Sequence, residues 1–399
     1  MLGISKMAAG VEPSATLAAA ARARQLKSEG KDVLDFSVGE PDFPTPKFIC
    51  DAGSLAITQG KTRYTPASGT LELRKTIASW YESEYGLLVT PEQVIVSGGA
   101  KQSIHNTLAA LVGPGDEVII PTPYWVSYGD LVKMTGATAV LVQTTLDSGF
   151  KMTREQLEGA ITPRTKLLML NSPSNPTGAV YSRYELEAFS EVVVAQNIGV
   201  ISDEIYEKLV FGNTKATCFA TLHPALAERV ITISGVSKTY AMTGWRIGWA
   251  IGPKHVVSAM GNIQSQETSN PSSISQEAAR AALTGDQAFL EPMIKEFEAR
   301  RDLICSGLNK IPGIRCFVPD GAFYAFFDIS GTFGKSVAGG PFHTDTEFCQ
   351  AALDHALVCL VQGSAFGAAG HARLSFAASR SQLEEGLRRL SHWLAKTSP

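Results

Sequence analysis

Short apolar runs alternate with longer amphipathic segments between about residues 90 and 255. Near-continuous apolar runs are typical of strands buried on both faces of a parallel sheet. Two of the intervening segments begin with the polar pairs of a capping box, Thr153 with Gln156 and Ser182 with Glu185. The pattern predicts one large α/β domain with a mostly parallel central sheet covered by helices on both faces. Its predicted strands are QVIVSGG (93–99), DEVIIP (116–121), TKLLMLNSP (165–173), IGVISDE (198–204), RVITIS (229–234) and RIGWAIG (246–252).

The pattern changes after Gly285. Residues 289–311 predict a long amphipathic helix, residues 315–329 predict hairpin-like strands, and two further helical patterns flank the short strand at 371–377. These elements predict a smaller α+β domain, to which the segment before residue 50 is also expected to belong. The predicted division is 1–48 for the N-terminal arm and part of the small domain, 49–285 for the large domain and 286–399 for the rest of the small domain.

Composition narrows the function classes. The 399-residue chain has a net charge of −3, so no basic surface predicts DNA, RNA or an anionic membrane as a partner. No apolar run approaches the roughly 20 residues of a membrane helix. The six cysteines and seven histidines show no metal-ligand spacing, so we expect no metal and free thiols. We expect a soluble, cytoplasmic protein, or one in a plastid or other organelle if a transit peptide has been removed.

Several polar residues follow the predicted strands, and each alone has an ordinary structural explanation. Gly99 precedes a helix start near Ala100, which suits an anion site or a tight turn equally. Asp203 ends an apolar strand, where it caps a helix or pairs with a cation. Asn175 fits a plain Asn-Pro turn, and Trp125 fits a core or rim position.

Cationic residues add a second pattern. Arg246 and Arg373 lie beside apolar segments, either as paired structural ions or as anion receptors. Lys238 lies among small and hydroxyl residues with no acid nearby, either as a solvated lysine or as an amine that forms a covalent bond. Together, the residues suit a phosphate, a pyridine nitrogen, an aromatic ring and an aldehyde. The reagent with these four parts is pyridoxal phosphate, which acts as an electron sink.

Eight short stretches occur in order along the chain: GEPDFPTP, YTPASGTLELR, GGAKQ, PYWVSY, NSPSNPTG, SDEIYE, SKTYAMTGWRIG and GAFY. They resemble the motifs of class I aminotransferases. The similarity extends from about Pro13 to the final helix and is nearest to the aspartate aminotransferases of subgroup Ib, including their aspartate/prephenate branch. The resemblance implies the fold type I architecture, a homodimer with active sites at the subunit interface, and ping-pong amino transfer between L-aspartate and 2-oxoglutarate.

The resemblance also implies residue roles. Lys238 bonds to the cofactor aldehyde and, once freed by substrate, moves the proton between Cα and the cofactor. Asp203 pairs with the ring nitrogen, Tyr206 and Asn175 bond the phenolic oxygen, and Trp125 stacks on the ring. Arg373 binds the substrate α-carboxylate, with Asn175 and the Gly39 backbone. The implied phosphate ligands are the Gly99, Ala100 and Lys101 backbone, Ser237, Arg246, and Tyr64 of the other subunit.

Two departures bear on specificity and on the phosphate site. Some relatives bind the distal carboxylate with an arginine before Ser-Asn-Pro, but no arginine occurs between 255 and 279. In the resembled subgroup a lysine does this work, and Lys101 stands at that position. Gly235 replaces a common serine, so either Ser234 or Ser237 reaches the phosphate. Thr16 matches a threonine associated with prephenate transamination to arogenate.

Two alternatives to an aspartate aminotransferase stay open. The first is a related reaction of the same cofactor, such as β-elimination or transfer from another amino donor. The second is a cofactor-binding regulator fused to a DNA-binding module. The regulator requires an extra helix-turn-helix segment and a basic face, and the sequence shows neither before the resemblance begins.

Overall fold

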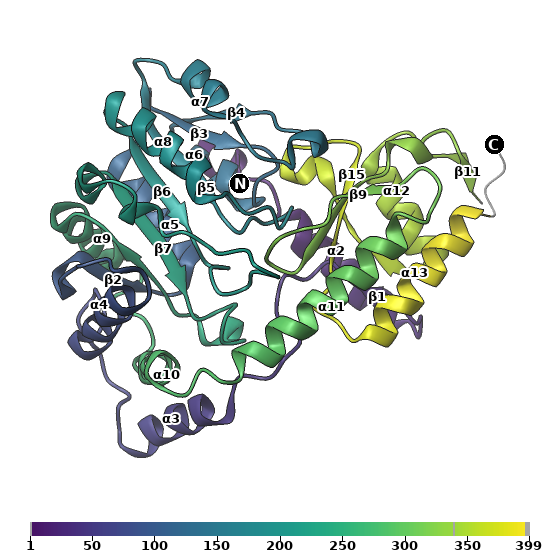
Figure 1. Cartoon of the computed structure of the whole chain (residues 1–399). Helices are drawn as coiled ribbons and strands as arrows, with labels where there is room; N and C mark the ends of the chain where they lie inside the picture. Colours follow the sequence, from purple (N-terminus) through teal and green to yellow (C-terminus); the bar gives the residue numbers. More distant parts are fainter. Residues whose placement is uncertain (1, 338–339, 396–399) are drawn as a thin grey trace.

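A seven-stranded sheet lies at the centre of the larger part of the molecule in the computed structural model, which describes residues 2–337 and 340–395 (Figure 1). Its order is β2-β8-β7-β6-β5-β3-β4. The pairs from β7 to β4 are parallel, whereas β8 is antiparallel to both neighbours. The predicted mostly parallel sheet is confirmed. The strands are β2 (Val94–Ser97), β3 (Glu117–Pro121), β4 (Thr138–Val142), β5 (Thr165–Asn171), β6 (Gly199–Asp203), β7 (Val230–Gly235) and β8 (Gly248–Ile251).

Helices cover both faces of this sheet because its strands are apolar on both sides. In β3, Val118 and Ile120 pack with α5, α6 and α9, whereas Ile119 packs against the opposite layer with α7 and α8. Both predicted capping boxes are present, at the starts of α7 and α8. The helices are α3 (Lys47–Thr58), α4 (Leu71–Tyr85), α5 (Ala100–Leu111), α6 (Ser127–Met134), α7 (Arg154–Ala160), α8 (Arg183–Ala195), α9 (Lys254–Glu267) and α10 (Ser273–Thr284).

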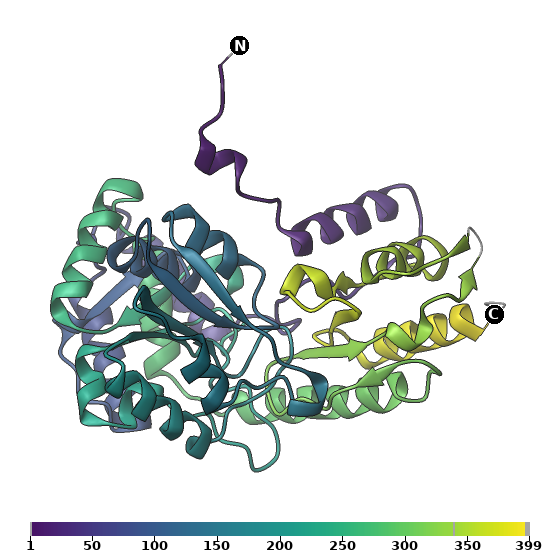
Figure 2. The ribbon, with the colours of Figure 1, turned by 90° about the horizontal axis from the view of Figure 1, so that it is seen from above.

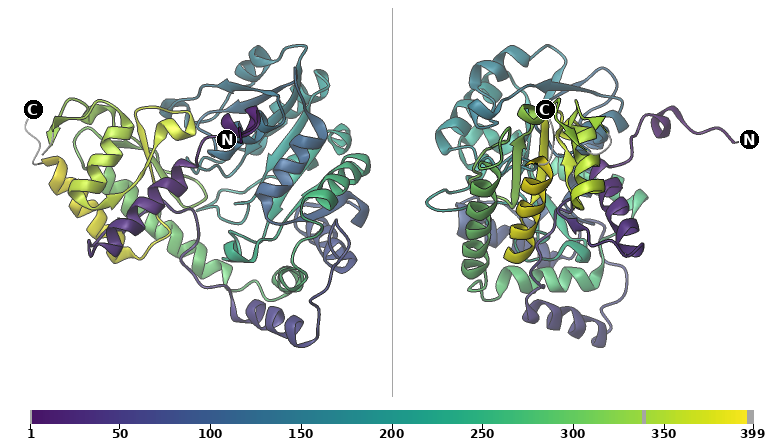
Figure 3. Two further views of the ribbon diagram at one scale, coloured as in Figure 1. Left: turned by 180° about the vertical axis from the view of Figure 1, so that it is seen from behind. Right: turned by 90° about the vertical axis from the view of Figure 1, so that its right-hand side faces the viewer.

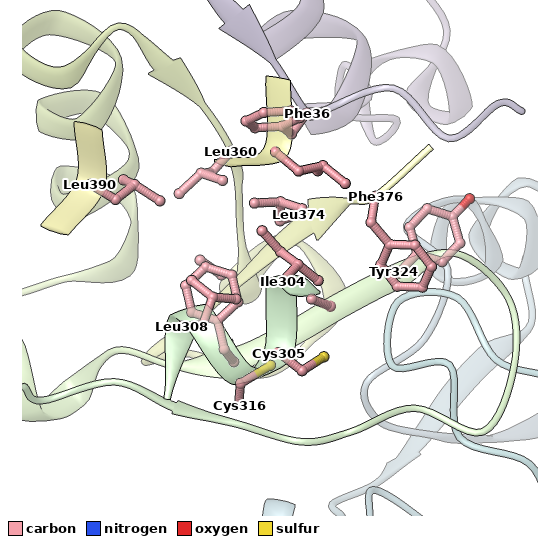
Figure 4. Close-up of a cluster of buried hydrophobic side chains, with 14 of the residues drawn as sticks. Phe36, Ile304, Cys305, Leu308, Cys316, Tyr324, Leu360, Leu374, Phe376 and Leu390 are labelled. Atoms are coloured by element: carbon pink, nitrogen blue, oxygen red, sulfur yellow. The ribbon is translucent and has the colours of Figure 1, made fainter. Parts of the chain in front are cut away.

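A second sheet, with the order β14-β15-β10-β9, organises the C-terminal part. All of its pairs are antiparallel. The long helix α11 and the C-terminal helix α13 pack beside it around an apolar core that includes Ile304, Leu374 and Leu390 (Figure 4). The elements are α11 (Leu290–Leu308), β9 (Arg315–Cys316), β10 (Tyr324–Asp328), β11 (Ser336–Val337), β12 (Gly340–Pro341), α12 (Asp345–Ala351), β13 (Val358–Cys359), β14 (Val361–Gln362), β15 (His371–Ser375) and α13 (Arg380–Ala395).

The N-terminal segment joins this smaller core, as expected. β1 (Leu34–Asp35) pairs in parallel with β13, and α2 (Ala15–Ser28) packs on β13 and β14. The preceding segment, with α1 (Lys6–Ala9), extends away from the rest of the chain (Figures 2 and 3). The domain boundaries stay a prediction, and of the ranges given for them residues 1, 338–339 and 396–399 lie outside the described residues. No helix within the described ranges is long and apolar enough to cross a membrane.

Candidate active site

A cavity of about 330 Å³ lies at the carboxyl end of the central sheet, where parallel α/β sheets bind their ligands. Asn171 and Asp203, the last residues of β5 and β6, line it. Tyr324 and Arg373 reach it from β10 and β15 of the smaller sheet. The predicted site residues that line the cavity are Thr16, Gly39, Ala100, Lys101, Trp125, Asn175, Asp203, Tyr206, Ser237, Lys238, Arg246 and Arg373.

Two predicted residues do not line the cavity wall. Gly99 is the N-cap of α5 and lies directly behind Ala100. Tyr64 is 90% exposed and lies outside the cavity. The role predicted for Tyr64 is at the active site of a second subunit, so it stays a prediction.

The amine of Lys238 lies just past the end of β7 and points into the cavity. Its Nζ donates a hydrogen bond of 2.6 Å to the carbonyl oxygen of Gly39. Burial lowers the pKa of this amine to about 8, although the exposed acid Glu40 partly opposes the shift. Arg246 and Arg373 lower it further by charge repulsion. Lys238 is therefore a desolvated amine with a carbonyl partner and no ion pair among the described residues.

Asp203 presents a carboxylate to the same cavity and is 3% exposed. Burial raises its pKa to about 6, whereas hydrogen bonds from Tyr128 and the Ile205 backbone lower it. Tyr128 Oη donates to Oδ2 at 2.6 Å, and the Ile205 N–H donates to Oδ1 at 3.2 Å. Turn residues follow β6, so Asp203 does not cap a helix. Its carboxylate is free to meet a cationic group in the cavity.

The start of α5 forms an anion-binding cradle with Arg246. The first amides of a helix have no intrahelical acceptor, and Gly99 provides no side-chain cap. A Cβ atom on Gly99 would lie 2.3 Å from Arg246 Nη2, so only glycine permits this close approach. The guanidinium donates to the carbonyls of Thr243 and Gly98 but pairs with no described carboxylate.

The choice between the two candidate serines follows from their contacts. Ser234 lies within β7 and is fully buried, and its Oγ donates to Glu207 Oε1 at 3.1 Å. Ser237 lines the cavity beside Lys238. The structure therefore places Ser237, and not Ser234, next to the cradle.

Arg373 is a fully buried cation on β15. Its Nη1 donates to Asn175 Oδ1 at 2.9 Å, and its Nη2 donates to the Ser37 carbonyl at 2.5 Å. Its Nε has no partner within the described part of the chain. Its guanidinium carbon lies 4.7 Å from the ring centre of Tyr324. A buried guanidinium with no acidic partner is suited to bind an anion that enters the cavity.

The side chain of Lys101 extends over the indole of Trp125, with Nζ 4.9 Å from the ring centre. Partial burial lowers its pKa, and Arg246 lowers it further. This ammonium is a further cation at the cavity and, within the described ranges, forms no ion pair. The sequence has no arginine between residues 255 and 279, so Lys101 stays the predicted receptor for a distal carboxylate.

Two tyrosines of the site received no role from the sequence. Tyr128 bonds Asp203, and Tyr324 Oη lies 2.7 Å from Tyr206 Oη. Both belong to stretches that resemble the family, PYWVSY and GAFY, but only the fold shows what their hydroxyls contact. Their spacing carries no further signal, because Trp125 precedes α6 and does not share a helix face with Tyr128.

Comparisons with known proteins agree with this geometry. The family model for aminotransferase class I and II matches residues 31–390. The aspartate/prephenate aminotransferase of Cereibacter sphaeroides is 48% identical over 100% of both chains. The aspartate aminotransferase of Geobacillus stearothermophilus is 45% identical over 98% of both.

Solved structures are equally similar. The crystal structure of the aspartate aminotransferase from Rhizobium meliloti superimposes with a TM-score of 0.96, 44% identity and complete coverage of both chains. The aspartate aminotransferase from Thermus thermophilus, solved with maleate, has a TM-score of 0.93 and 40% identity over 98% of this chain and 100% of its own. By the extent of these matches, the chain belongs to the family of class I and II aminotransferases.

Proposed function

We propose that this chain is an aspartate aminotransferase, which transfers the amino group between L-aspartate and 2-oxoglutarate to give oxaloacetate and L-glutamate. The observation that carries the proposal is the convergence of Lys238, Arg373 and Lys101 on one cavity. None of these cations pairs with a carboxylate of the described residues. One reactive amine and two anion receptors suit an amino acid with two carboxylates.

We infer that the cofactor is pyridoxal phosphate, because the cavity residues fit each of its parts. The α5 cradle, Ser237 and Arg246 would hold the phosphate. The buried carboxylate of Asp203 suits a protonated ring nitrogen, and the Trp125 indole suits a stacked ring. When bound, the cofactor would supply an aldehyde for attachment to Lys238 and an electron sink for the reaction at the substrate Cα.

The chain's own residues then supply proton transfer and orientation. The Nζ of Lys238 takes the proton from the substrate Cα. Because burial lowers its pKa to about 8, part of the amine population is neutral near neutral pH and able to accept a proton. Arg373 binds the α-carboxylate through its planar fork, and Asn175 fixes the orientation of that fork. Nζ also donates a hydrogen bond to the Gly39 carbonyl, so the two groups lie together at the cavity.

The second carboxylate of aspartate would meet Lys101. The ammonium already lies at the cavity edge over Trp125, so it is positioned without forming a competing ion pair. The solved relative with maleate, a four-carbon dicarboxylate, supports a substrate of this size in a closely similar fold. Because an ammonium is a point charge, it tolerates more than one placement of the distal carboxylate.

We propose a homodimer with shared active sites as the working form. The N-terminal segment extends away from the rest of the chain (Figure 2). Its apolar side chains are exposed in the single chain, including Leu2, Ile4 and Met7. Tyr64 is likewise exposed, and it does not line the cavity that contains Lys238 in its own chain. Both features suit contact with a second copy, in which Tyr64 would approach the partner's phosphate cradle.

A second substrate, prephenate, is favoured by one further observation. Thr16 lines the same cavity from the first turn of α2. Relatives along the whole chain carry the name aspartate/prephenate aminotransferase. We propose that prephenate is an alternative amino acceptor, which would give arogenate.

Steady-state assays of the protein loaded with pyridoxal phosphate test these proposals. Formation of oxaloacetate from L-aspartate and 2-oxoglutarate supports the main proposal, provided that Lys238→Ala abolishes it. Turnover of L-alanine or an aromatic amino acid in preference to L-aspartate would contradict it. Replacing 2-oxoglutarate by prephenate tests the second substrate, since arogenate must then appear with oxaloacetate. If no arogenate forms at an enzyme concentration that completes the reaction of L-aspartate with 2-oxoglutarate, prephenate is excluded as an amino acceptor.

A further inference from the structure

Tyr128 contacts two of the side chains that the proposed function places against the cofactor. It lies in the first turn of α6, is 2% exposed, and lines the cavity. We propose that Tyr128 is a positioning residue: its hydroxyl orients the Asp203 carboxylate, and its ring fixes the plane of Trp125. The inference rests on the proposed function, because the roles of Asp203 and Trp125 belong to it.

The hydroxyl contact is short and completes the carboxylate's set of donors. Tyr128 Oη donates to Asp203 Oδ2 at 2.6 Å, while Oδ1 accepts the Ile205 N–H. With one donor on each oxygen the carboxylate plane is fixed, and each oxygen keeps a second lone pair for a ligand in the cavity. Without the phenol, Oδ2 would have no side-chain donor among the described residues.

The ring contact is independent of the hydroxyl. The Tyr128 and Trp125 rings are 5.5 Å apart at 90°, an edge-to-face pair. Trp125 is only half-buried, and Lys101 lies over its ring. The edge of the Tyr128 ring therefore restrains the indole where it meets the interior of the protein. One side chain therefore contacts both the carboxylate that would pair with the ring nitrogen and the indole that would stack on the ring.

The environment of Asp203 explains why this hydroxyl has more than a packing role. The titratable groups that face the carboxylate are Tyr128 from α6, Lys238 after β7, and the neighbours Glu204 and Tyr206. Burial raises the pKa of Asp203 to about 6, so at neutral pH the carboxyl is ionised, but by a much smaller margin than an exposed aspartate. The phenol donates to the ionised form and favours it. A neutral Asp203 would give a protonated ring nitrogen no counter-charge.

The test compares two isosteric variants. Tyr128→Phe removes the hydroxyl but keeps the ring that contacts Trp125. Tyr124→Phe is the matched control, because Tyr124 is in the same PYWVSY stretch and its hydroxyl makes no hydrogen bond within the described ranges. In cofactor-free protein, an infrared or carbon-13 titration of the Asp203 carboxyl, assigned with Asp203→Asn, should move to higher pH in Tyr128→Phe only. Coincident titrations of Tyr128→Phe and the parent protein would overturn the inference.

Kinetics of the loaded enzyme separate positioning from packing. Loss of a hydrogen bond to a charged group predicts that Tyr128→Phe lowers kcat for L-aspartate by about tenfold to a hundredfold, with KM within about twofold of the parent. A rise in KM at unchanged kcat, or an equal loss in Tyr124→Phe, would also overturn it. If the protein does not transaminate aspartate, the titration still decides the Tyr128–Asp203 link, so the two failures are distinguishable.

Discussion

Arg373 Nη1 donates to Asn175 Oδ1 at 2.9 Å, although 198 positions separate the two residues. The arginine belongs to β15 of the smaller sheet, and the asparagine follows β5 of the larger one. This bond therefore links the smaller sheet to the turn that follows β5 of the larger sheet, at the cavity. It also orients one edge of a buried guanidinium whose Nε has no partner in the described part of the chain.

Arg373→Lys should weaken substrate binding. A lysine has no planar fork, so it cannot bond Asn175 and a substrate carboxylate in the same geometry. We expect KM for L-aspartate to rise by about tenfold to a hundredfold, as for loss of a hydrogen bond to a charged group. Arg315→Lys, on the neighbouring sheet surface where the arginine pairs with Asp328, is the matched control and should leave KM unchanged. Equal KM values for the two variants would refute a substrate role for Arg373.

Lys101→Ala should remove selectivity for dicarboxylic substrates. The ammonium lies over Trp125 without an acidic partner in the described ranges, so its loss affects the distal carboxylate and little else. We expect kcat/KM for L-aspartate to fall at least about tenfold more than kcat/KM for L-alanine. Lys133→Ala, which removes an exposed lysine paired with Asp130, serves as the control. Equal losses for the two amino acids would exclude Lys101 as the distal receptor.

Lys238→Met should stabilise the cofactor-free protein in a pH-dependent way. The pKa of Lys238 falls from its ordinary 10.5 to about 8 because of burial, so the folded state disfavours the charged amine. Below pH 8 the amine is protonated in both the folded and the unfolded state, so the folded state bears the full free-energy cost of a buried charge. Between pH 8 and 10.5 the unfolded state holds more protons, so stability rises with pH.

The free energy of unfolding of the variant should therefore exceed that of the parent by up to about 3 kcal/mol at pH 7, since a pKa difference of one unit corresponds to about 1.4 kcal/mol. The difference should vanish by about pH 10.5. Urea unfolding of both cofactor-free proteins across this range measures it. A gap that stays constant with pH would contradict the lowered pKa of Lys238.

Glu207→Gln should have the opposite pH dependence. Burial, and secondarily Glu204, raises the pKa of Glu207 from 4.5 to about 8. The carboxyl faces Tyr85, Ser234 and Lys208, and its protonated form contributes stability below pH 4.5 that is lost as pH rises through 8.

A glutamine imitates the neutral carboxyl, so the variant should match the parent near pH 5 and be more stable by on the order of 2 kcal/mol at pH 9. Thermal or urea unfolding at the two pH values measures the difference. Glu84→Gln, which alters an exposed acid paired with Lys208, is the control. Destabilisation by Glu207→Gln at pH 9 would show that the buried carboxylate is ionised at little cost.

The fold was largely predictable because the sequences of buried parallel strands are continuous apolar runs. The six predicted strands are present with small differences at their ends. β4 was missed because Thr138–Val142 is a partly exposed edge strand in which polar and apolar environments alternate weakly. The antiparallel direction of β8 was also not predictable, because an apolar run indicates a buried strand but not its direction within the sheet.

The place of Lys238 and Asp203 at one cavity was predictable, because each lies in a motif that carries its chemistry locally. The site was not predictable where a contact depends on distant elements. The resemblance implies Ser237 as a phosphate ligand with Ser234 as the open alternative, and the contact of Ser234 with Glu207, which favours Ser237, joins residues 27 positions apart. Tyr128 and Tyr324 carried no distinguishing pattern, because a buried phenol is an ordinary core residue until its hydroxyl is seen to meet Asp203 or Tyr206.

The most direct test of the proposed transaminase is a half-reaction with a single substrate. Protein loaded with pyridoxal phosphate is mixed with L-aspartate and no oxo acid, and the visible absorption band of the cofactor is followed. The band should disappear with release of oxaloacetate in proportion to active sites and return on adding 2-oxoglutarate, and Lys238→Ala should release no oxaloacetate. A band that neither L-aspartate nor L-glutamate alters, in a protein shown to hold the cofactor, would contradict the proposed function.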